Sequence, residues 1–269
     1  MTRLRSLTRP RSLSRLSFVG RRLPDGARLA VGTLTAIPVP PPRRVDAATA
    51  RTAMLLAPLV GLLPATVAVA VGWAATRAAP GPLVVAVLVV AVLALTTRGL
   101  HLDGLADTAD GLASSYDRDR ALQVMRRGDV GPAGVVTLVL VLLAQTACLA
   151  QATGSGDLAT ATVVAVVSSR TTLPLLCARG VPLARTTGLG SSVIGTVPRT
   201  AATAVLAATC GVAWLVGGPA GAGAVLAAAA AAGLLAARCV RRLGGLTGDV
   251  LGAGVELGGL AALFVLAAW

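Results

Sequence analysis

Long apolar runs are the feature that most restricts how this 269-residue chain can fold. Several runs reach the roughly 20 residues that a helix needs to cross a hydrocarbon core about 30 Å thick. Only 13% of the residues are charged, against roughly 25% in an average soluble domain. Lipid offers the backbone no hydrogen-bond partners, so spanning segments of this kind must form their backbone hydrogen bonds internally, as helices do. The sequence therefore predicts an all-α, polytopic membrane protein.

We expect about seven transmembrane helices. Residues 25–269 would form one integral membrane catalytic domain. The Arg- and Ser-rich tail, 1–24, is expected to be disordered; its composition also resembles a transit peptide, and it lacks the apolar stretch of a secretory signal. The predicted spans are 53–75, 82–98, 131–151, 158–178, 200–217, 220–237 and 250–268.

The arginines orient these spans. The chain has 24 arginines and no lysine, and eleven of the arginines precede the first span. Arg-rich and Arg-poor segments alternate, which the positive-inside rule explains if the N-terminus is cytoplasmic. An active site among the polar segments would then face the cytoplasm. The rich segments are the N-terminal tail, 98–129, 179–199 and 238–249, and the poor ones are 76–81, 152–157 and 217–219.

The net charge of +13 raises the question of nucleic-acid binding, which we reject. Aromatic residues make up only 2% of the chain, so it has no stacking surface for bases. Arginines beside apolar spans are explained by membrane topology. Four cysteines without metal-binding spacing are expected to be buried packing side chains: Cys148, Cys177, Cys210 and Cys239.

The acidic residues gather in one segment. Six of the eleven lie within 103–129. On a helix Asp103, Asp107 and Asp110 share one face, and Asp117 would follow them if the helix continued. Their repulsion is strong beside a membrane unless a cation offsets it. We expect Mg²⁺ on Asp103, Asp107 and Asp110, serving transfer chemistry on a diphosphate. An acidic solvated helix balanced by nearby arginines is the alternative.

Three other features are candidates for the site. His101, the single histidine, is a candidate base, ligand or phosphate donor, although a helix would point it away from the aspartates. In segment 178–193, phosphate binding is expected from side chains and backbone donors of Arg179, Arg185, Gly188 and Ser191. Segment 241–258 carries Asp249 and Glu256. Capped turns between spans are the alternative for both segments.

Five segments, which follow one another along the chain in the same order as in the family, resemble the cobalamin synthase family, or adenosylcobinamide-GDP ribazoletransferases. The most specific segment is HLDGLADTADGL (101–112) together with the run RALQVMRRGDVGPAG (120–134) that follows it. Thr33 and Arg127 stand where the family more often has an aromatic residue and an acid. The resemblance runs from about residue 28 to the C-terminus. Its other segments are LAVGTLTAIPVP (29–40), LAPLVGLLPA (56–65), PLARTTGLGSS (182–192) and GGLTGDVLGAGVEL (244–257).

The resemblance implies a Mg²⁺-dependent, multi-pass enzyme of a bacterial plasma membrane. It would join adenosylcobinamide-GDP to α-ribazole, or its 5′-phosphate, and release GMP late in coenzyme B12 synthesis. Asp103, Asp107 and Asp110 would hold Mg²⁺, and Arg179 and Arg185 would contact phosphate or guanosine. Asp249 would complete the metal site or accept a proton.

Two other functions compete with this interpretation. A CDP-alcohol phosphotransferase also uses spaced aspartates at a membrane, but its AR pair is missing at the required offset after Asp103 and Gly104. A cation-coupled transporter would place its carboxylates near the bilayer midplane, whereas these lie at a span boundary. The oligomeric state stays open, a homo-oligomer included.

Overall fold

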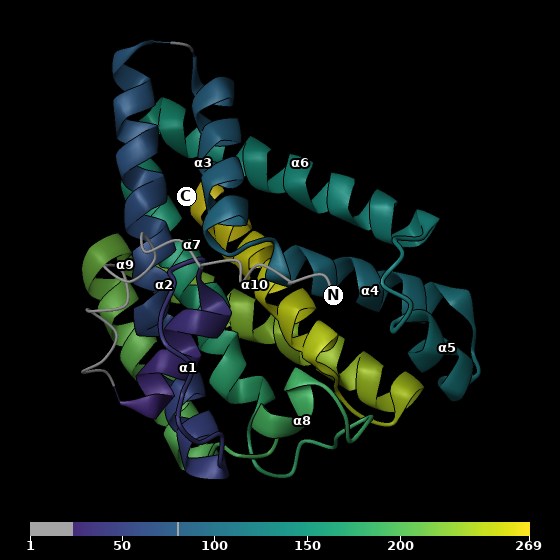
Figure 1. Ribbon diagram of the computed structural model, residues 1–269. Coiled ribbons are helices and arrows are strands. Elements are labelled where there is room, and N and C mark those ends of the chain that lie inside the picture. Colours follow the sequence, from purple (N-terminus) through teal and green to yellow (C-terminus); the bar gives the residue numbers. More distant parts are fainter. Residues whose placement is uncertain (1–23, 80) are drawn as a thin grey trace, which may run out of the picture.

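The computed structural model describes residues 24–79 and 81–269, so all of the predicted tail except Pro24 lies outside the described residues. The described chain is helical and contains no strand beyond two isolated bridges, which confirms the all-α prediction (Figure 1). Its helices are Asp25–Leu34 (α1), Ala47–Arg77 (α2), Pro82–Thr96 (α3), Leu100–Ser114 (α4), Arg118–Val124 (α5), Pro132–Ser155 (α6), Leu158–Leu176 (α7), Leu189–Val193 (α8), Arg199–Leu243 (α9) and Gly248–Ala267 (α10).

Five of these helices are long and apolar enough to span a membrane: α2, α6, α7, α9 and α10. A sixth span is possible only for α3 and α4 together, and that pair is bent by 90°. The chain turns between them at Arg98 and Gly99, both with left-handed backbone angles. Because α4 carries His101 and three aspartates, we take α3, which at 15 residues is shorter than the other spans, as the part of this bent pair that lies in the membrane.

The 45-residue helix α9 is a hairpin of two arms. Its backbone is non-helical at Gly217 and Gly218, where a turn was predicted. Beyond the turn, Gly221 packs directly on the carbonyl of Ala213. A continuous helix would hold residues eight apart at about 12 Å, so the chain reverses here. Each of the seven predicted spans therefore coincides with a helix or with one arm of α9.

The bundle has two chemically different ends. At one, the rim end, Arg118 donates to the carbonyls of Leu243 and Ala184, at 2.7 and 2.9 Å, and so joins three Arg-rich segments. At the other, Gln151 donates to the carbonyl of Ala267, and a Cβ on Gly217 would lie 3.6 Å from Thr160. Arg-poor loops thus gather at the far end, as the alternation predicts.

Small residues allow the spans to pack closely. Buried alanines of the second α9 arm face glycines of α10: a Cβ on Gly258 would lie 3.4 Å from the carbonyl of Ala228, and one on Gly254 would lie 3.7 Å from Ala232. Association in lipid depends on such close contact, because burying apolar surface there gains little. This packing holds α10 firmly in the middle of the bundle, and α10 supports the site.

Candidate active site

Glycines bring the polar segments together at the rim end. A Cβ on Gly104 would come within 2.6 Å of the carbonyl of Asp249, and one on Gly252 within 3.2 Å of the Cα of His101. These two glycines let α4 cross α10 in direct contact (Figure 1). Gly190 of α8 packs on the backbone of Gly248 in the same way. The glycine-rich segments therefore permit close helix approach.

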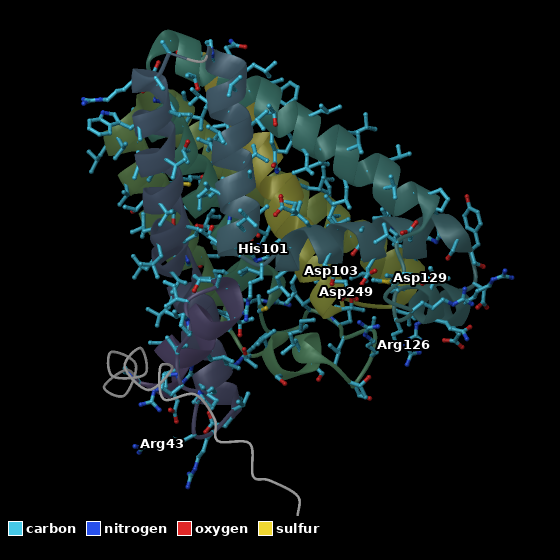
Figure 2. All side chains as sticks on the ribbon, turned by 45° about the horizontal axis from the view of Figure 1, so that its top comes forward. Arg43, His101, Asp103, Arg126, Asp129 and Asp249 are labelled. Carbon is cyan, nitrogen blue, oxygen red and sulfur yellow. The ribbon has the colours of Figure 1, made fainter. Side chains whose placement is uncertain are left out.

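A cavity of about 620 Å³ opens where these elements meet. All three predicted polar segments line it, so the fold brings them to one cavity. Figure 2 shows Asp103 and Asp249 together, with His101 to one side. The polar and glycine lining comes mainly from α4, segment 185–193 and α10: His101, Asp103, Arg185, Thr187, Gly188, Ser192 and Asp249.

The pair formed by Arg185 and Asp249 is the best-defined contact in this cavity. Arg185 Nη2 donates to Asp249 Oδ2 at 2.7 Å, and the Thr247 hydroxyl donates to the same oxygen at 3.0 Å. The two charged side chains are only 17% and 21% exposed. Arg185 Nη1 is buried and has no hydrogen-bond partner. Half of the guanidinium group is therefore free for an anion.

His101 has unpaired polar atoms in the same cavity. Its side chain is 2% exposed, and neither ring nitrogen has a partner. Burial lowers its pKa to about 3, with a smaller contribution from Arg170, so the ring is neutral near pH 7. A buried polar group left unpaired costs about 1–3 kcal/mol. Together with Arg185 Nη1, His101 indicates a site that pairs fully only with a ligand.

The predicted aspartate helix is confirmed, but its three members have different surroundings. Asp103 is exposed and lines the cavity. Asp107 is buried, and burial, followed by the charges of Asp103, Asp249 and Asp110, raises its pKa to about 6. Asp110 accepts from the backbone amides of Gly131 at 2.7 Å and Gly134 at 2.9 Å.

Asp110 therefore caps the N-terminus of α6, where a negative charge is favourable. This explains why an acid stands at its position without any metal. The helix does not continue to Asp117. It ends at Ser114, and Asp117 instead caps α5 by accepting from Arg120 N at 2.8 Å.

The carboxylates suit a metal shared with substrate better than one held by protein alone. No group of three or more His, Cys, Asp or Glu side chains within residues 24–79 and 81–269 is arranged to hold a metal ion. Among the residues that the structure describes, no backbone amide donates to the carboxylates of Asp103 and Asp107 as those of Gly131 and Gly134 do to Asp110. Mg²⁺ typically takes one or two carboxylates and completes its shell with phosphates and water, which these two residues can provide.

Two predicted phosphate ligands do not line the cavity. Arg179 is exposed in a turn where its own amide donates to Val197 and its carbonyl accepts from Arg199. The Ser191 hydroxyl donates to the carbonyl of Gly188, at 2.7 Å, while neighbouring Ser192 lines the cavity. Phosphate contact by Arg179 and Ser191 stays a prediction, and Arg185 is the arginine that the fold brings to the site.

Sequence reasoning missed a polar cluster between the spans. Gln145 of α6 donates to Glu256 of α10 at 3.0 Å. Arg170 of α7 is 7% exposed, donates to Ser169 at 2.7 Å and lines a small cavity with Glu256. The available signal was an arginine inside an apolar run, since ionisable residues within membrane spans are rare and usually functional.

Comparison with known proteins agrees with this geometry. The family model described as cobalamin-5-phosphate synthase matches residues 26–267. An adenosylcobinamide-GDP ribazoletransferase of Nocardioides sp. is 48% identical over 91% of this chain and 99% of its own. Proteins of the same name from Frankia casuarinae and Escherichia coli are each 40% identical, over 90% and 78% of this chain and 94% and 85% of theirs.

No solved structure is significantly similar to the chain. The family match extends over both the bundle and every residue of the rim cavity. By sequence, spans and site, the chain belongs to the cobalamin-5-phosphate synthase family.

Proposed function

We propose that this protein transfers the adenosylcobinamide-phosphate group of adenosylcobinamide-GDP to α-ribazole, or to its 5′-phosphate, and releases GMP. The observation that carries the proposal is the half-paired Arg185 beside Asp249 and Asp103 in one cavity. A buried guanidinium nitrogen without an acceptor suits a phosphate oxygen. The names of the relatives identify which phosphate compound this would be.

The reaction requires one bond to form and one to break. A ribose hydroxyl of the acceptor attacks the phosphorus that carries the cobinamide, and the bond from that phosphorus to the bridging oxygen breaks. GMP leaves with the bridging oxygen, and the hydroxyl proton passes to a carboxylate. Because the 5′-phosphate of a phosphorylated acceptor is retained, the attacking oxygen is a different ribose hydroxyl.

The residues divide this work by their positions. Arg185 Nη1 binds a diphosphate oxygen and offsets the charge that develops on the leaving group. Asp249, held by Arg185 and Thr247, accepts the proton. His101 is neutral, so its ring offers one donor and one acceptor to a substrate hydroxyl or phosphate. Such a reaction depends mainly on positioning and charge neutralisation.

Asp103 and Asp107 would hold Mg²⁺ together with the diphosphate. The metal would supply charge neutralisation on the phosphate oxygens when bound. Asp110 takes no part in this proposal, because its oxygens cap α6.

We place the enzyme in a bacterial plasma membrane with its cavity toward the cytoplasm. The Arg-rich segments and the cavity lie at the same end of the bundle, and Arg-rich ends are retained on the cytoplasmic side. Protease accessibility of the 179–199 segment in inverted membrane vesicles, but not in intact cells, would support this orientation; the reverse pattern would contradict it.

The decisive experiment is an assay of the purified, detergent-solubilised protein with adenosylcobinamide-GDP, α-ribazole and Mg²⁺. We expect stoichiometric GMP release and a cobalamin product, both lost when EDTA is added. Absence of GMP release, under conditions where the Escherichia coli relative is active, would overturn the proposal. Turnover that persists in EDTA would overturn the metal role alone.

A further inference from the structure

The elements that line the cavity differ in chemistry. The charged side consists of Asp103, Arg185 and Asp249, from α4, segment 185–193 and α10. The lining from α1, α2 and α7 carries no charge: it consists of Leu29, Leu34, Met54 and Leu173, which we call the apolar wall, with a hydroxyl from Thr33. Further apolar lining comes from Val45 and, on the elements of the charged side, from Leu100, Leu189, Val193 and Leu251. Leu34, Met54 and Leu173 are at most 5% exposed, so the packing of the bundle holds this wall in place.

The volume limits what can enter. About 620 Å³ lies within the roughly 300–1,000 Å³ of pockets that enclose one small organic ligand. A nucleoside such as α-ribazole is of this size. Adenosylcobinamide-GDP joins a corrin ring system to two nucleosides and is several times larger, so only its diphosphate region and one adjoining group fit beside the charged side.

Polarity distinguishes the bases that could meet the wall. Guanine carries donors and acceptors around its edge, and these need polar partners when water is excluded. Among the described residues of the wall there is no carboxylate, amide or cationic side chain. The base of α-ribazole is a benzimidazole with two methyl groups and no exocyclic donor or acceptor. Its only polar atom that is not substituted is one ring nitrogen, so on leucine and methionine side chains it leaves far fewer polar groups unpaired than guanine would.

From these observations we propose that the apolar wall binds the base of α-ribazole and directs its ribose toward Asp103, Arg185 and Asp249. This assignment rests on the proposed function and adds to it the side of the cavity that each substrate occupies. Leu29, Leu34, Met54 and Leu173 are then the residues that determine which bases the acceptor can carry.

Two methionines provide a matched test. Met54 and Met125 are 4% and 2% exposed and belong to the same apolar core, but only Met54 lines the cavity. For Met54→Ala we expect the KM for α-ribazole to rise about tenfold, which is typical of lost apolar contact in a specificity pocket. The KM for adenosylcobinamide-GDP should change less than twofold. Met125→Ala should leave both KM values within twofold.

A change in the substrate tests for direct contact. The α-riboside of benzimidazole lacks the two methyl groups of α-ribazole. If Met54 touches those methyl groups, the ratio of kcat/KM for the two acceptors should be smaller in Met54→Ala than in the wild type, because interacting groups are not additive. Met125→Ala should keep the wild-type ratio.

Several results would overturn the assignment. These are a selective rise in the KM for adenosylcobinamide-GDP in Met54→Ala, equal effects of the two alanine variants, or an unchanged acceptor ratio. If the wild type releases no GMP, the proposed function fails. Binding of α-ribazole, measured by calorimetry without the second substrate, then tests whether the apolar wall binds its base. An affinity for α-ribazole that is about tenfold weaker in Met54→Ala than in the wild type would support the assignment. It would be contradicted if the variant bound as tightly as the wild type, or if the wild type showed no detectable binding.

Discussion

Helix α10 carries two acids, seven residues apart, in contrasting surroundings. Asp249 lies at the rim cavity of about 620 Å³, paired with an arginine that keeps one buried nitrogen free. Glu256 lies between the spans, where it accepts from Gln145 and shares a cavity of only about 50 Å³ with Arg170. Both acids have arginine and a neutral polar side chain nearby.

The difference shows that residue types alone do not make an active site. At Asp249, unpaired donors face a space large enough for substrate. Around Glu256, the polar atoms face one another and there is room for little beyond water. We interpret the first cluster as catalytic and the second, which joins α6, α7 and α10, as a cluster that holds α10 in its orientation. Four predictions test this contrast.

The largest effect is expected from Glu256→Leu. It removes the acid that lines the same small cavity as the buried Arg170 and leaves Gln145 without its acceptor. A buried charge that loses its compensation costs about 3–5 kcal/mol. Thermal unfolding in detergent should begin well below the wild-type temperature. The matched double variant Arg170→Leu/Glu256→Leu should recover most of the loss, since apolar replacement of two buried opposite charges is often neutral. Normal unfolding combined with lost turnover would instead place Glu256 in the chemistry.

The next largest effect is expected from Arg185→Gln. Glutamine can still donate to Asp249 but cannot offset charge on the diphosphate, so kcat/KM should fall on the order of 10²–10³-fold. The unfolding temperature should change little. Arg179→Gln is the matched comparison, because Arg179 is exposed outside the cavity. GMP release within twofold of wild type in this variant would exclude the phosphate contact predicted for Arg179 from the sequence. Equal losses of kcat/KM in the two variants would contradict the proposed contact between Arg185 Nη1 and the diphosphate.

The pH dependence should report Asp107. Its pKa is raised to about 6 by burial and neighbouring acids, so the carboxylate is mostly ionised at pH 7 and mostly protonated at pH 5. If the ionised form holds Mg²⁺, GMP release should fall about tenfold between these values. More Mg²⁺ should move the midpoint to lower pH, because metal and proton compete. A flat profile from pH 5 to 7.5 would contradict this role.

The smallest effect is expected from Asp110→Asn. An asparagine can accept from one of the two α6 amides without the negative charge, and weakened caps cost about 1 kcal/mol. We expect a lower unfolding temperature and nearly normal dependence of GMP release on Mg²⁺. Asp107→Asn should show the opposite, with normal unfolding and lost turnover. If Asp110→Asn needed a higher Mg²⁺ concentration for GMP release, this result would support Asp110 as a Mg²⁺ ligand.

Much of the fold could be predicted because spans are local features. Run length located seven apolar segments that are all helical in the structure, and the Gly217–Gly218 turn inside α9 follows from two glycines before Pro219. The 90° bend between α3 and α4 could not be predicted, because it depends on how α4 packs against α6 and α10 rather than on Arg98 and Gly99 alone.

The site was predicted less completely. Helical spacing placed Asp103, Asp107 and Asp110 on one face, which the structure confirms. The spacing could not show that the backbone amides of Gly131 and Gly134, more than 20 residues later, donate hydrogen bonds to the Asp110 carboxylate. Nor could it separate Arg185 from Arg179, because the two have similar neighbours in sequence and differ only in where the 178–193 segment turns.

The sequence by itself determined the class of protein, the positions of its apolar helices and the polar segments that line the cavity. These depend on apolar length, arginine distribution and residue type, which are local properties. Only the tertiary structure decided which polar groups share a cavity and which cap a helix or join spans. That outcome depends on where α4, α8 and α10 meet at Gly104, Gly190 and Gly252, contacts between residues far apart in the chain.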